Sequence, residues 1–530
     1  MTDIIKIESI STIVVIVAAL VALWLNFKRD LMMLQLNSYR NERYARWFST
    51  SGESTAVLRL VIIAVLFCMV GTLMPFVAAS LIAVVVMMWI VIALARRKYK
   101  KPLVWTNRAR RIFVTMWIVS QAIAVICYFL TMSLKYVAVY EVLLNWISPI
   151  ILQVSNWMLQ PVEKKINKGY YNDAVRILKQ MPNLKIIGIT GSYGKTSTKH
   201  YLNRILAEQF DVVMTPGSYN TTMGVIRTIR EYLKPYNEVF IVEMGAKQSG
   251  DIKKICDLVH PTMGIVTAVG EQHLESFKSI ENIQKTKFEL IDALPSDGFA
   301  VVNDDFEYVA NRPVDSVECV RYAVRNVGNA DYVATEISLD STGTTFTIEG
   351  QSRKLTLHTK LVGECNVSNL MAAIIIALKL GVDDNKIRYA VDKIEQVEHR
   401  LNMKRTAGSV TIIDDAFNSN PTGSKMALEV LGAMKGGKRI VVTPGMIELG
   451  DRQYELNREL GRNAASNADY VIVVGEYNRD AIVAGLKDEE YPKNKVYAAS
   501  SFADAQSHLS TMLASGDIVL YENDLPDTFK

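Results

Sequence analysis

Cysteine is sparse in this sequence, with five residues among 530. None belongs to a CxxC pair, and Cys68 and Cys127 lie within apolar runs. This spacing argues against a disulfide framework and against a cysteine-based zinc site, so neither is expected. We expect reduced, mostly buried thiols, also at Cys256, Cys319 and Cys365, because free cysteine is among the most buried residue types.

An excess of one charge is also missing, since the net charge is only +5. The basic residues of the first half stand beside apolar runs, so a membrane surface explains them better than nucleic acid does. No nucleic-acid partner is therefore expected. Half of the residues are hydrophobic, and the apolar excess precedes Leu159. The sequence contains no internal repeat and no low-complexity segment.

The first apolar run, residues 9–27, carries no charge and is long enough to cross a hydrocarbon core of about 30 Å. No basic region precedes it, and no small-residue cleavage site follows it. We therefore interpret it as an anchor and not as a cleaved signal peptide.

Four further apolar runs follow, at residues 55–70, 76–95, 113–134 and 136–159. The last run contains Glu141 and Asn145, and a helix lying in the membrane interface has the same pattern. We predict a membrane domain over residues 1–160 with about five transmembrane helices, and a connector over 161–182. Whether these helices bind a lipid-linked substrate or only anchor the chain is left open.

Basic segments set the predicted orientation. Residues 96–111 contain eight Lys and Arg and no acidic residue, and further basic residues follow the first and last runs. Positively charged loops stay in the cytoplasm, and five spans place all three segments on one side. The sequence thus predicts a multi-pass protein of the plasma membrane with its N-terminus outside and the chain after Pro161 in the cytoplasm.

The remaining chain predicts an α/β fold. Short β-branched runs alternate with helical stretches from about residue 183, which is typical of a parallel sheet covered by helices. A Thr- and Ser-rich patch at residues 334–361 predicts antiparallel hairpins attached to that sheet. We expect a central domain over 183–398 and a Rossmann-like C-terminal domain over 399–530.

A glycine-rich turn carries the strongest chemical signal. Residues 188–199 read GITGSYGKTSTK, so a strand enters the turn and a helix leaves it. This order points backbone N–H groups at phosphate, with Lys195 near the terminal phosphates and Thr196 near Mg²⁺. Ile189 stands where the strict P-loop spacing has glycine, so the loop is a variant of that motif. A chance tight turn before a helix is the alternative.

The same motif resembles the ATP-binding loop of the Mur ligase family, most closely its UDP-N-acetylmuramoyl-tripeptide–D-alanyl-D-alanine ligase branch. Further matches follow in chain order, including GSYNTTMG at 217–224, VEMGAKQSGDI at 242–252, VGEQHLESF at 269–277, GECNVSNLMAA at 363–373, DDAFNSNP at 414–421 and GMIELG at 445–450. Their number and order favour this family much more than any one motif does.

The resemblance implies ATP and Mg²⁺, with two ions expected. Glu243 matches a metal-binding glutamate, and His273 matches a histidine near the second ion. Lys287 matches a lysine that becomes carbamylated, although Lys285 is only two residues away. The remaining family positions imply nucleotide contacts, at Gly191, Ser192, Gly194, Lys195, Thr196, Ser197, Asn366, Asn369, Arg400, Asp415, Asn418 and Asn420. Cys365 replaces the histidine usual in the family, which puts one base contact in doubt.

In this family the γ-phosphoryl group of ATP passes to a substrate carboxylate, and the amine of an amino acid or short peptide attacks the acyl phosphate. Lys195, Lys287, His273 and Arg400 are the residues expected to serve this chemistry. Soluble relatives begin with a domain that binds a UDP-linked donor, whereas apolar runs stand there in this chain. A lipid-linked donor therefore becomes a candidate beside a nucleotide-linked one. The acidic end at Glu522 suits a cationic amine.

Other functions remain open at this stage. A membrane-bound poly-γ-glutamate-type synthase also joins a membrane segment to a Mur-like ATPase, but its phosphate loop is shorter. A non-catalytic nucleotide-binding scaffold of the cell envelope is a second alternative, although Lys195, Glu243 and Lys287 are all present. An ATP-driven transporter is a third, and the absence of a second ATPase cassette counts against it.

Overall fold

The computed structural model describes residues 2–52, 57–70, 75–97, 99, 101–339, 343–406, 408–416 and 419–525. The chain forms two compact units. The first comprises residues 1–167 and 525–530, and the second comprises residues 168–524. Each unit is described by itself.

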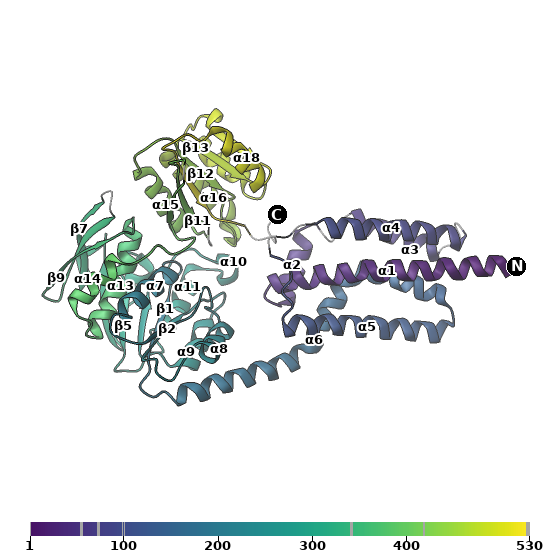
Figure 1. Ribbon diagram of the computed structural model, residues 1–530, viewed down its shortest axis with the longest axis horizontal. Coiled ribbons are helices and arrows are strands. Elements are labelled where there is room, and N and C mark those ends of the chain that lie inside the picture. The colour runs from purple at the N-terminus through teal and green to yellow at the C-terminus, as the bar shows by residue number, and fades with distance from the viewer. Residues whose placement is uncertain are drawn as a thin grey trace. The chain divides into compact units, whose positions relative to one another are not determined.

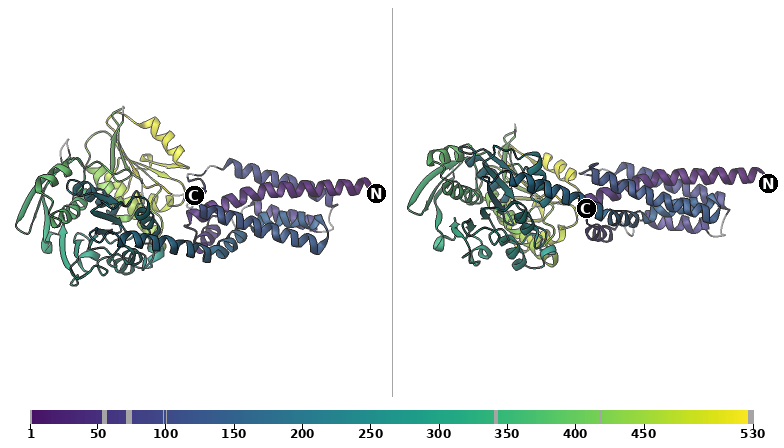
Figure 2. Two further views of the ribbon diagram at one scale, coloured as in Figure 1. Left: turned by 60° about the horizontal axis from the view of Figure 1, so that its bottom comes forward. Right: turned by 90° about the horizontal axis from the view of Figure 1, so that it is seen from below.

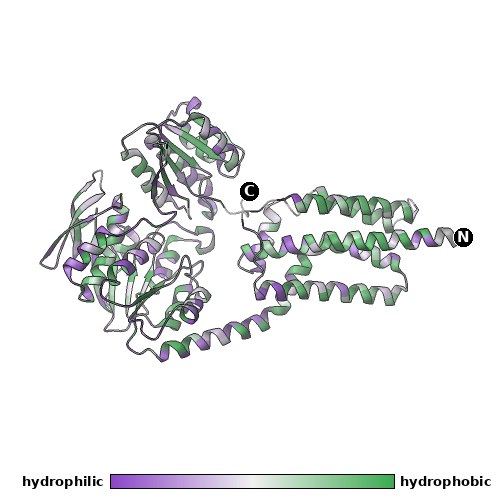
Figure 3. Ribbon diagram, in the orientation of Figure 1, coloured by the Kyte–Doolittle hydropathy of each residue, from purple (hydrophilic) through white to green (hydrophobic). Residues whose placement is uncertain are grey.

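The first unit is a helical bundle (Figure 1). Its helices are α1 (Thr2–Leu36), α2 (Asn41–Thr50), α3 (Val57–Val70), α4 (Phe76–Arg96), α5 (Asn107–Thr131) and α6 (Leu134–Lys179). Small and branched apolar residues form its interior, among them Ala19, Ala83 and Ala138, each fully buried. Many large apolar side chains are exposed instead, and the helices of the bundle are coloured mostly as hydrophobic in Figure 3. A surface of this kind is typical of helices that face lipid.

Side-chain contacts fix which helix ends lie together. The Gln35 side chain makes two hydrogen bonds of 2.9 Å with the backbone of Val104, so the end of α1 lies beside the α4–α5 loop. At the opposite end, Lys135 forms an ion pair of 2.9 Å with Glu8 and lies over the ring of Phe76, the first residue of α4. Helices α1, α4 and α6 therefore run in one direction and α5 runs in the opposite one, as Figures 1 and 2 also show, and α3 carries the chain back between the end of α1 and the start of α4.

Four helices are long and apolar enough to cross a membrane: Lys6–Leu36, Phe76–Arg96, Asn107–Thr131 and Leu134–Lys179. The second expected span is the exception. Its helix α3 has 14 residues, whereas a 30 Å core needs about 20, and Thr55 and Ala56 of the expected run lie outside the described residues. The number five therefore stays a prediction, and it depends on α3.

Two pairs of buried polar side chains lie inside the bundle. Asn26 donates to Asn145 at 2.8 Å, and Ser148 donates to Asp30 at 2.6 Å. Each pair joins α1 to α6. Buried polar groups without a partner are costly in an apolar environment, so these pairs fix how the two helices face each other.

The second unit begins with a nine-stranded sheet in the order β2-β3-β1-β4-β5-β6-β7-β8-β9. Its strands are β1 (Lys185–Thr190), β2 (Val212–Met214), β3 (Val239–Glu243), β4 (Met263–Val266), β5 (Phe299–Asn303), β6 (Glu318–Ala323), β7 (Tyr332–Leu339), β8 (Thr344–Gly350) and β9 (Arg353–Thr359). Pairing is parallel up to β7, and β7, β8 and β9 pair antiparallel. The predicted parallel sheet and its antiparallel hairpins are both confirmed.

Helices cover both faces of this central sheet. One core contains α7 (Lys195–Leu206), α13 (Glu364–Lys379) and α14 (Asp384–Asp392). The other contains α8 (Thr222–Glu231), α9 (Asp251–Val259), α11 (Ile280–Phe288) and the last turns of α6. The short helices α10 (Leu274–Phe277), α12 (Glu307–Ala310) and η1 (Val327–Asn329) lie in the connections. Because parallel strands share a direction, their carboxyl ends meet at one edge, where α/β proteins place their sites.

A second, six-stranded sheet has the order β10-β11-β15-β12-β13-β14. Its strands are β10 (Asn402–Arg405), β11 (Thr411–Asp415), β12 (Arg439–Thr443), β13 (Tyr470–Val474), β14 (Val496–Ala499) and β15 (Ile518–Glu522). All pairs are parallel except β10 with β11. The helices are α15 (Pro421–Ala433), α16 (Gln453–Asn467), α17 (Arg479–Asp488) and α18 (Phe502–Met512), with short turns η2 (Gly450–Arg452) and η3 (Lys493–Lys495). This is the expected Rossmann-like arrangement.

Candidate active site

The glycine-rich turn joins β1 to α7, as predicted. Gly191 and Gly194 both have positive φ, at 152° and 80°. A side chain at Gly194 would meet Asn369 Oδ1 at 2.3 Å, and one at Gly191 would meet Thr267 Oγ1 at 2.1 Å. Both positions therefore require glycine, and the turn leaves its backbone open at the N-terminus of α7, where phosphate binds.

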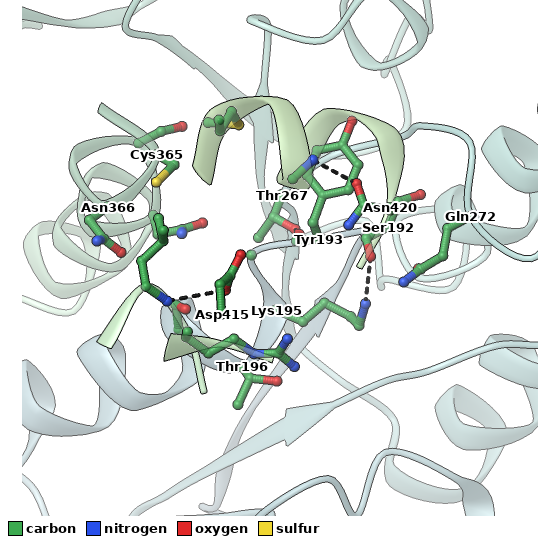
Figure 4. A pocket seen from close by; sticks show the side chains of 18 of the residues that line it. Ser192, Tyr193, Lys195, Thr196, Thr267, Gln272, Cys365, Asn366, Asp415 and Asn420 are labelled. Atoms are coloured by element: carbon green, nitrogen blue, oxygen red, sulfur yellow. Dashed lines mark hydrogen bonds between the residues drawn. The ribbon is translucent and has the colours of Figure 1, made fainter. Parts of the chain in front are cut away.

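Lys195 folds back over this turn. Its Nζ donates to the carbonyl of Gly191 at 2.5 Å and to that of Ser192 at 3.2 Å; Figure 4 shows the second of these bonds. Burial lowers the pKa of Lys195 to about 8, although the nearby carboxylate of Glu243 opposes this shift. A lysine held only by two carbonyl groups is well placed to turn to an incoming phosphate.

Ser192, Thr196 and Ser197 follow the same turn and line one pocket with Lys195. The Ser192 hydroxyl is occupied, because it donates to Gly270 O at 3.0 Å and accepts from Gly270 N at 3.1 Å. It holds the turn against the segment that follows β4. Thr196 is partly exposed and lines the pocket.

Asn366 and Asn369 support the turn from α13. Asn369 Oδ1 accepts from Thr198 at 3.2 Å and packs against Gly194. Asn366 accepts from the Tyr201 hydroxyl at 2.7 Å and donates to Val362 O at 2.8 Å. Both side chains thus fasten α13 to α7, and both also line the pocket.

Glu243 ends β3 beside the turn and is 1% exposed. It accepts a hydrogen bond of 3.0 Å from Asn220 and pairs with Lys199 at 2.9 Å. Burial raises the pKa of Glu243, but the charges of Lys199 and Lys195 outweigh burial and hold it below its ordinary value. The side chain is therefore a carboxylate in a buried position.

Lys287 and Lys285 differ sharply in environment although both lie on α11. Lys287 is 2% exposed, whereas Lys285 is exposed. Burial, together with the charge of Lys195, places the pKa of Lys287 well below its ordinary range. A neutral amine of this kind is the form that reacts with carbon dioxide, so burial favours Lys287 as the modified lysine.

His273 lies at the start of α10 in a left-handed conformation with φ of 55°. Its Nδ1 contacts the carboxylate of Glu448, which lies in the loop after β12 in the C-terminal domain. Burial lowers the pKa of His273, and the Glu448 carboxylate opposes that shift. The expected histidine is thus close to Lys287, whose charge also acts on it.

Arg400, which precedes β10, and Asp415, the last residue of β11, both line the pocket. Asp415 accepts from the backbone N–H of Leu401 at 3.1 Å. Burial raises the pKa of Asp415 to about 6, with Arg400 opposing the shift. Burial likewise lowers the pKa of Arg400 from its ordinary value. An arginine at this position can neutralise charge on transferring phosphoryl groups.

One pocket brings most of the predicted residues together. It is lined by Ser192, Gly194, Lys195, Thr196, Ser197, Glu243, Asn366, Asn369, Arg400, Asp415 and Asn420, with Cys365 and Gln272 beside them. Figure 4 shows Asp415, Asn420, Thr267 and Ser192 around this pocket. Asn420 also caps α15 by accepting from Gly423 N at 2.9 Å. Asn418 lies outside the described residues.

Several residues of the site are not predicted by sequence reasoning. Lys199 lies one helical turn after Lys195, and that spacing is the only sequence signal for it. Glu522 lies opposite Asp415 because β15 pairs with β11, a relation that no local pattern reveals. It is fully buried and hydrogen-bonded to Ser419, so the acidic end does not offer this carboxylate to an amine. Glu448 belongs to the GMIELG motif but is not distinguished within it.

The donor set suits Mg²⁺ bound together with nucleotide phosphates. Among the described residues, no three His, Cys, Asp or Glu side chains form a metal cluster by themselves. Magnesium is commonly held by one or two carboxylates, by water and by substrate phosphate oxygens. Glu243 and Thr196, on either side of the phosphate turn, provide such a set.

Comparison with known proteins agrees with this geometry. The description "Mur ligase middle domain" matches residues 189–377, and "Mur ligase, glutamate ligase domain" matches residues 399–521. The UDP-N-acetylmuramoyl-tripeptide–D-alanyl-D-alanine ligase of Bacillus subtilis is 29% identical over 343 residues, which cover 64% of this chain and 72% of that protein. The Escherichia coli ligase of the same name is 28% identical over 360 residues, covering 67% and 79%.

Solved structures give the same result. MurF from Thermotoga maritima in complex with ADP has a TM-score of 0.61 and 26% identity, and covers 67% of this chain and 80% of its own. MurF from Acinetobacter baumannii has a TM-score of 0.60 and 26% identity, with coverages of 67% and 76%. With the sheets, the phosphate turn and the sequence matches in agreement, this chain belongs to the Mur ligase family of ATP-dependent amide-bond ligases.

Proposed function

We propose that this chain is a membrane-anchored ligase that joins the amine of an amino acid or short peptide to a carboxylate on a lipid-linked precursor of the cell envelope. The bundle anchors it in the plasma membrane with the catalytic domains in the cytoplasm. For this proposal we keep the domain bounds predicted from the sequence: membrane 1–160, connector 161–182, central 183–398 and C-terminal 399–530.

One observation carries the lipid-linked part of this proposal. Helix α6 starts in the apolar bundle and ends at Lys179, and the phosphate-binding strand β1 starts at Lys185. Only residues 180–184 separate them. The family matches begin at residue 189, so the chain before them is taken up by the apolar helices and this short link. A donor that is itself in the membrane suits such a connection.

The pocket residues suit transfer of the γ-phosphoryl group to a carboxylate. In that step a carboxylate oxygen attacks the γ-phosphorus and the bond from phosphorus to the ADP oxygen breaks. Lys195 and Arg400 neutralise charge on the phosphoryl oxygens, and the backbone N–H groups of the turn hold the phosphates. Mg²⁺, when bound, supplies further charge neutralisation, and Glu243 and Thr196 are placed to hold it, with His273 and carbamylated Lys287 near a second ion.

The amine then completes the reaction. It attacks the carbonyl carbon of the acyl phosphate, a C–N bond forms, and phosphate leaves with the electrons of the broken C–O bond. No protein nucleophile is needed, which fits a pocket whose reactive groups are cations and carboxylates. The relatives' names specify D-alanyl-D-alanine and a UDP-linked carboxylate donor. Both compounds are therefore included in the test.

The test measures ATP-dependent phosphate release by the full chain in detergent. Amino acids and dipeptides, including D-alanyl-D-alanine, are combined with lipid-linked or UDP-linked carboxylate donors, and products are identified by mass spectrometry. Release that needs one amine and a lipid-linked donor, and is lost in Lys195→Ala, is expected. Full activity on the UDP-linked donor and none on lipid-linked material contradicts the proposal. No turnover on any combination favours a nucleotide-binding scaffold.

A further inference from the structure

Glu448 lies in the loop between β12 and η2 and extends from the C-terminal domain to the central domain. Its Oε2 contacts His273, and its backbone carbonyl accepts from Glu275 N at 3.2 Å. The side chain is 27% exposed. It is therefore a carboxylate at the junction of the two domains that solvent, or a ligand, can still reach.

Both residues in this contact have strained backbones. Glu448 has φ of 63° and His273 has φ of 55°. A left-handed conformation at a residue other than glycine costs about 1–2 kcal/mol and persists only where the surroundings enforce it. Two such residues in contact, one from each domain, indicate a junction built for the placement of these side chains.

The loop that carries Glu448 is held firmly on both sides. Met446 and Leu449 are 1% and 2% exposed and anchor the loop in the core of the domain. Met446 N donates to Asn457 at 2.8 Å, and Asn523 donates to Gly445 O at 2.6 Å. These contacts leave little freedom in the loop, so the direction of Glu448 is fixed by the fold.

Lysine side chains lie in the neighbourhood of Glu448. Lys247 Nζ lies 4.0 Å from its Oε1, and Lys287 is near enough to His273 to act on its pKa. The phosphate end of the site thus holds lysines that suit phosphate and carboxylate groups. An ammonium group entering there requires an anion.

Three other carboxylates of the C-terminal domain, like Glu448, have partners within the protein. Asp415 accepts from Leu401 N and lines the nucleotide pocket. Asp414 pairs with His399 at 2.8 Å, and Glu522 is fully buried with Ser419. Glu448 is the C-terminal-domain carboxylate that reaches His273, next to the buried Lys287.

We propose that Glu448 binds the ammonium group of the amine substrate and holds its nitrogen at the acyl-phosphate end of the site. This inference rests on the proposed function and adds a residue that selects the amine. It also gives the C-terminal domain a role at the second step, because its approach brings this carboxylate to the central domain.

The overall step balances without a further reactant. The acyl phosphate and R–NH₃⁺ yield the amide, HPO₄²⁻ and one proton. The C–N bond forms and the C–O bond to phosphate breaks, with its electron pair leaving on phosphate. Of the three protons on the ammonium nitrogen, one stays on the amide, one ends on phosphate and one is released to water. Glu448 acts here as a binding group.

Comparing a charged amine with an uncharged nucleophile distinguishes ammonium binding by Glu448 from a purely structural role. The full chain is tested in detergent with the most active amino acid or dipeptide and, in parallel, with hydroxylamine, which is mostly uncharged at neutral pH and yields a hydroxamate. In Glu448→Gln the KM for the amine rises about 10- to 100-fold, the usual effect of losing a charge-assisted hydrogen bond. Hydroxamate formation stays within about twofold of the wild type.

Arg452→Ala is the matched control, because Arg452 and Glu271 form the neighbouring ion pair between the same domains. If Glu448 only holds the two domains together, Glu448→Gln and Arg452→Ala lower the activity with the amine and with hydroxylamine equally. That result overturns the proposal. A raised Mg²⁺ requirement in Glu448→Gln also overturns it, in favour of a metal ligand. A wild-type chain that makes no hydroxamate contradicts the proposed function itself, and the inference with it.

Discussion

Lys199 and Glu243 form an ion pair of 2.9 Å in which the two side chains are 0% and 1% exposed. Lys199 also donates to Gly217 O at 2.6 Å. The pair lies one helical turn beyond Lys195, at the carboxyl end of β3, and it keeps a carboxylate charged in a buried position. The lysine thus stabilises the very group that is expected to meet Mg²⁺.

Replacing Lys199 is expected to be strongly destabilising. Lys199→Met leaves Glu243 buried beside one fewer cation, and removal of one partner of a buried pair costs about 3–5 kcal/mol. Pulse proteolysis of the full chain in urea and mild detergent measures the loss. The double variant Lys199→Met, Glu243→Gln should recover part of it, because no buried charge is then left unpaired.

Arg227→Met provides the comparison. Arg227 pairs with Glu231 on α8 at 2.7 Å, but the two side chains are 55% and 46% exposed. Exposed pairs of this spacing contribute about 0.3–0.5 kcal/mol. Equal losses in Lys199→Met and Arg227→Met would show that burial does not set the strength of the Lys199–Glu243 pair.

Lys287 and Lys285 offer a second test on one helix. Lys287→Ala is expected to lower ligase turnover by about 10²-fold or more, the scale for losing a group that stabilises charge at a reacting centre. Lys285→Ala should retain wild-type turnover, since Lys285 is exposed. If carbon dioxide modifies Lys287, removal of bicarbonate lowers wild-type activity as well. Similar activity in both variants contradicts the assignment of Lys287.

Features that depend only on residues close together in the sequence are predicted well. The turn at residues 191–194 needs two glycines and a following helix, and those signals lie within twelve residues. The role of Lys199 and the buried position of Glu522 are not predicted, since both come from pairing: β1 with β3 brings Glu243 to the turn, and β11 with β15 brings Glu522 to Asp415. The role of Glu448 depends on contact between two domains, which no sequence spacing specifies.

The Asp415–Glu522 pair predicts a pH dependence of local stability. Burial raises both pKa values, that of Asp415 to about 6 and that of Glu522 well above its ordinary value, and the charge of Asp415 adds to the rise in the pKa of Glu522. The folded state therefore holds protons that the unfolded chain releases above about pH 4. The contribution of this pair to stability falls as pH rises through about 6 and beyond.

Glu522→Gln should remove that effect. The variant is expected to gain stability relative to the wild type as pH rises from about 4.5 to about 7.5, measured by hydrogen exchange of the β11 and β15 amides at each pH. Glu489→Gln, at an exposed position, should follow the wild type throughout. A constant difference between Glu522→Gln and wild type across this range contradicts a shared, folding-dependent proton.

The orientation of the bundle in the membrane can be determined with three variants. Each carries one introduced cysteine in a chain from which the five native cysteines have been removed. Five crossings put residues 49 and 102 in the cytoplasm and residue 132 outside. Four crossings without α3, with the N-terminus inside, keep residues 102 and 132 where they are but move residue 49 outside. The contacts between Gln35 and Val104 favour the first arrangement, because they bring the end of α1 to the α4–α5 loop.

An impermeant maleimide on intact cells should therefore label Met132→Cys, and should label Ser49→Cys and Pro102→Cys only after permeabilisation. Labelling of Ser49→Cys in intact cells contradicts a crossing by α3, and labelling of Pro102→Cys there contradicts the orientation set by the basic loops.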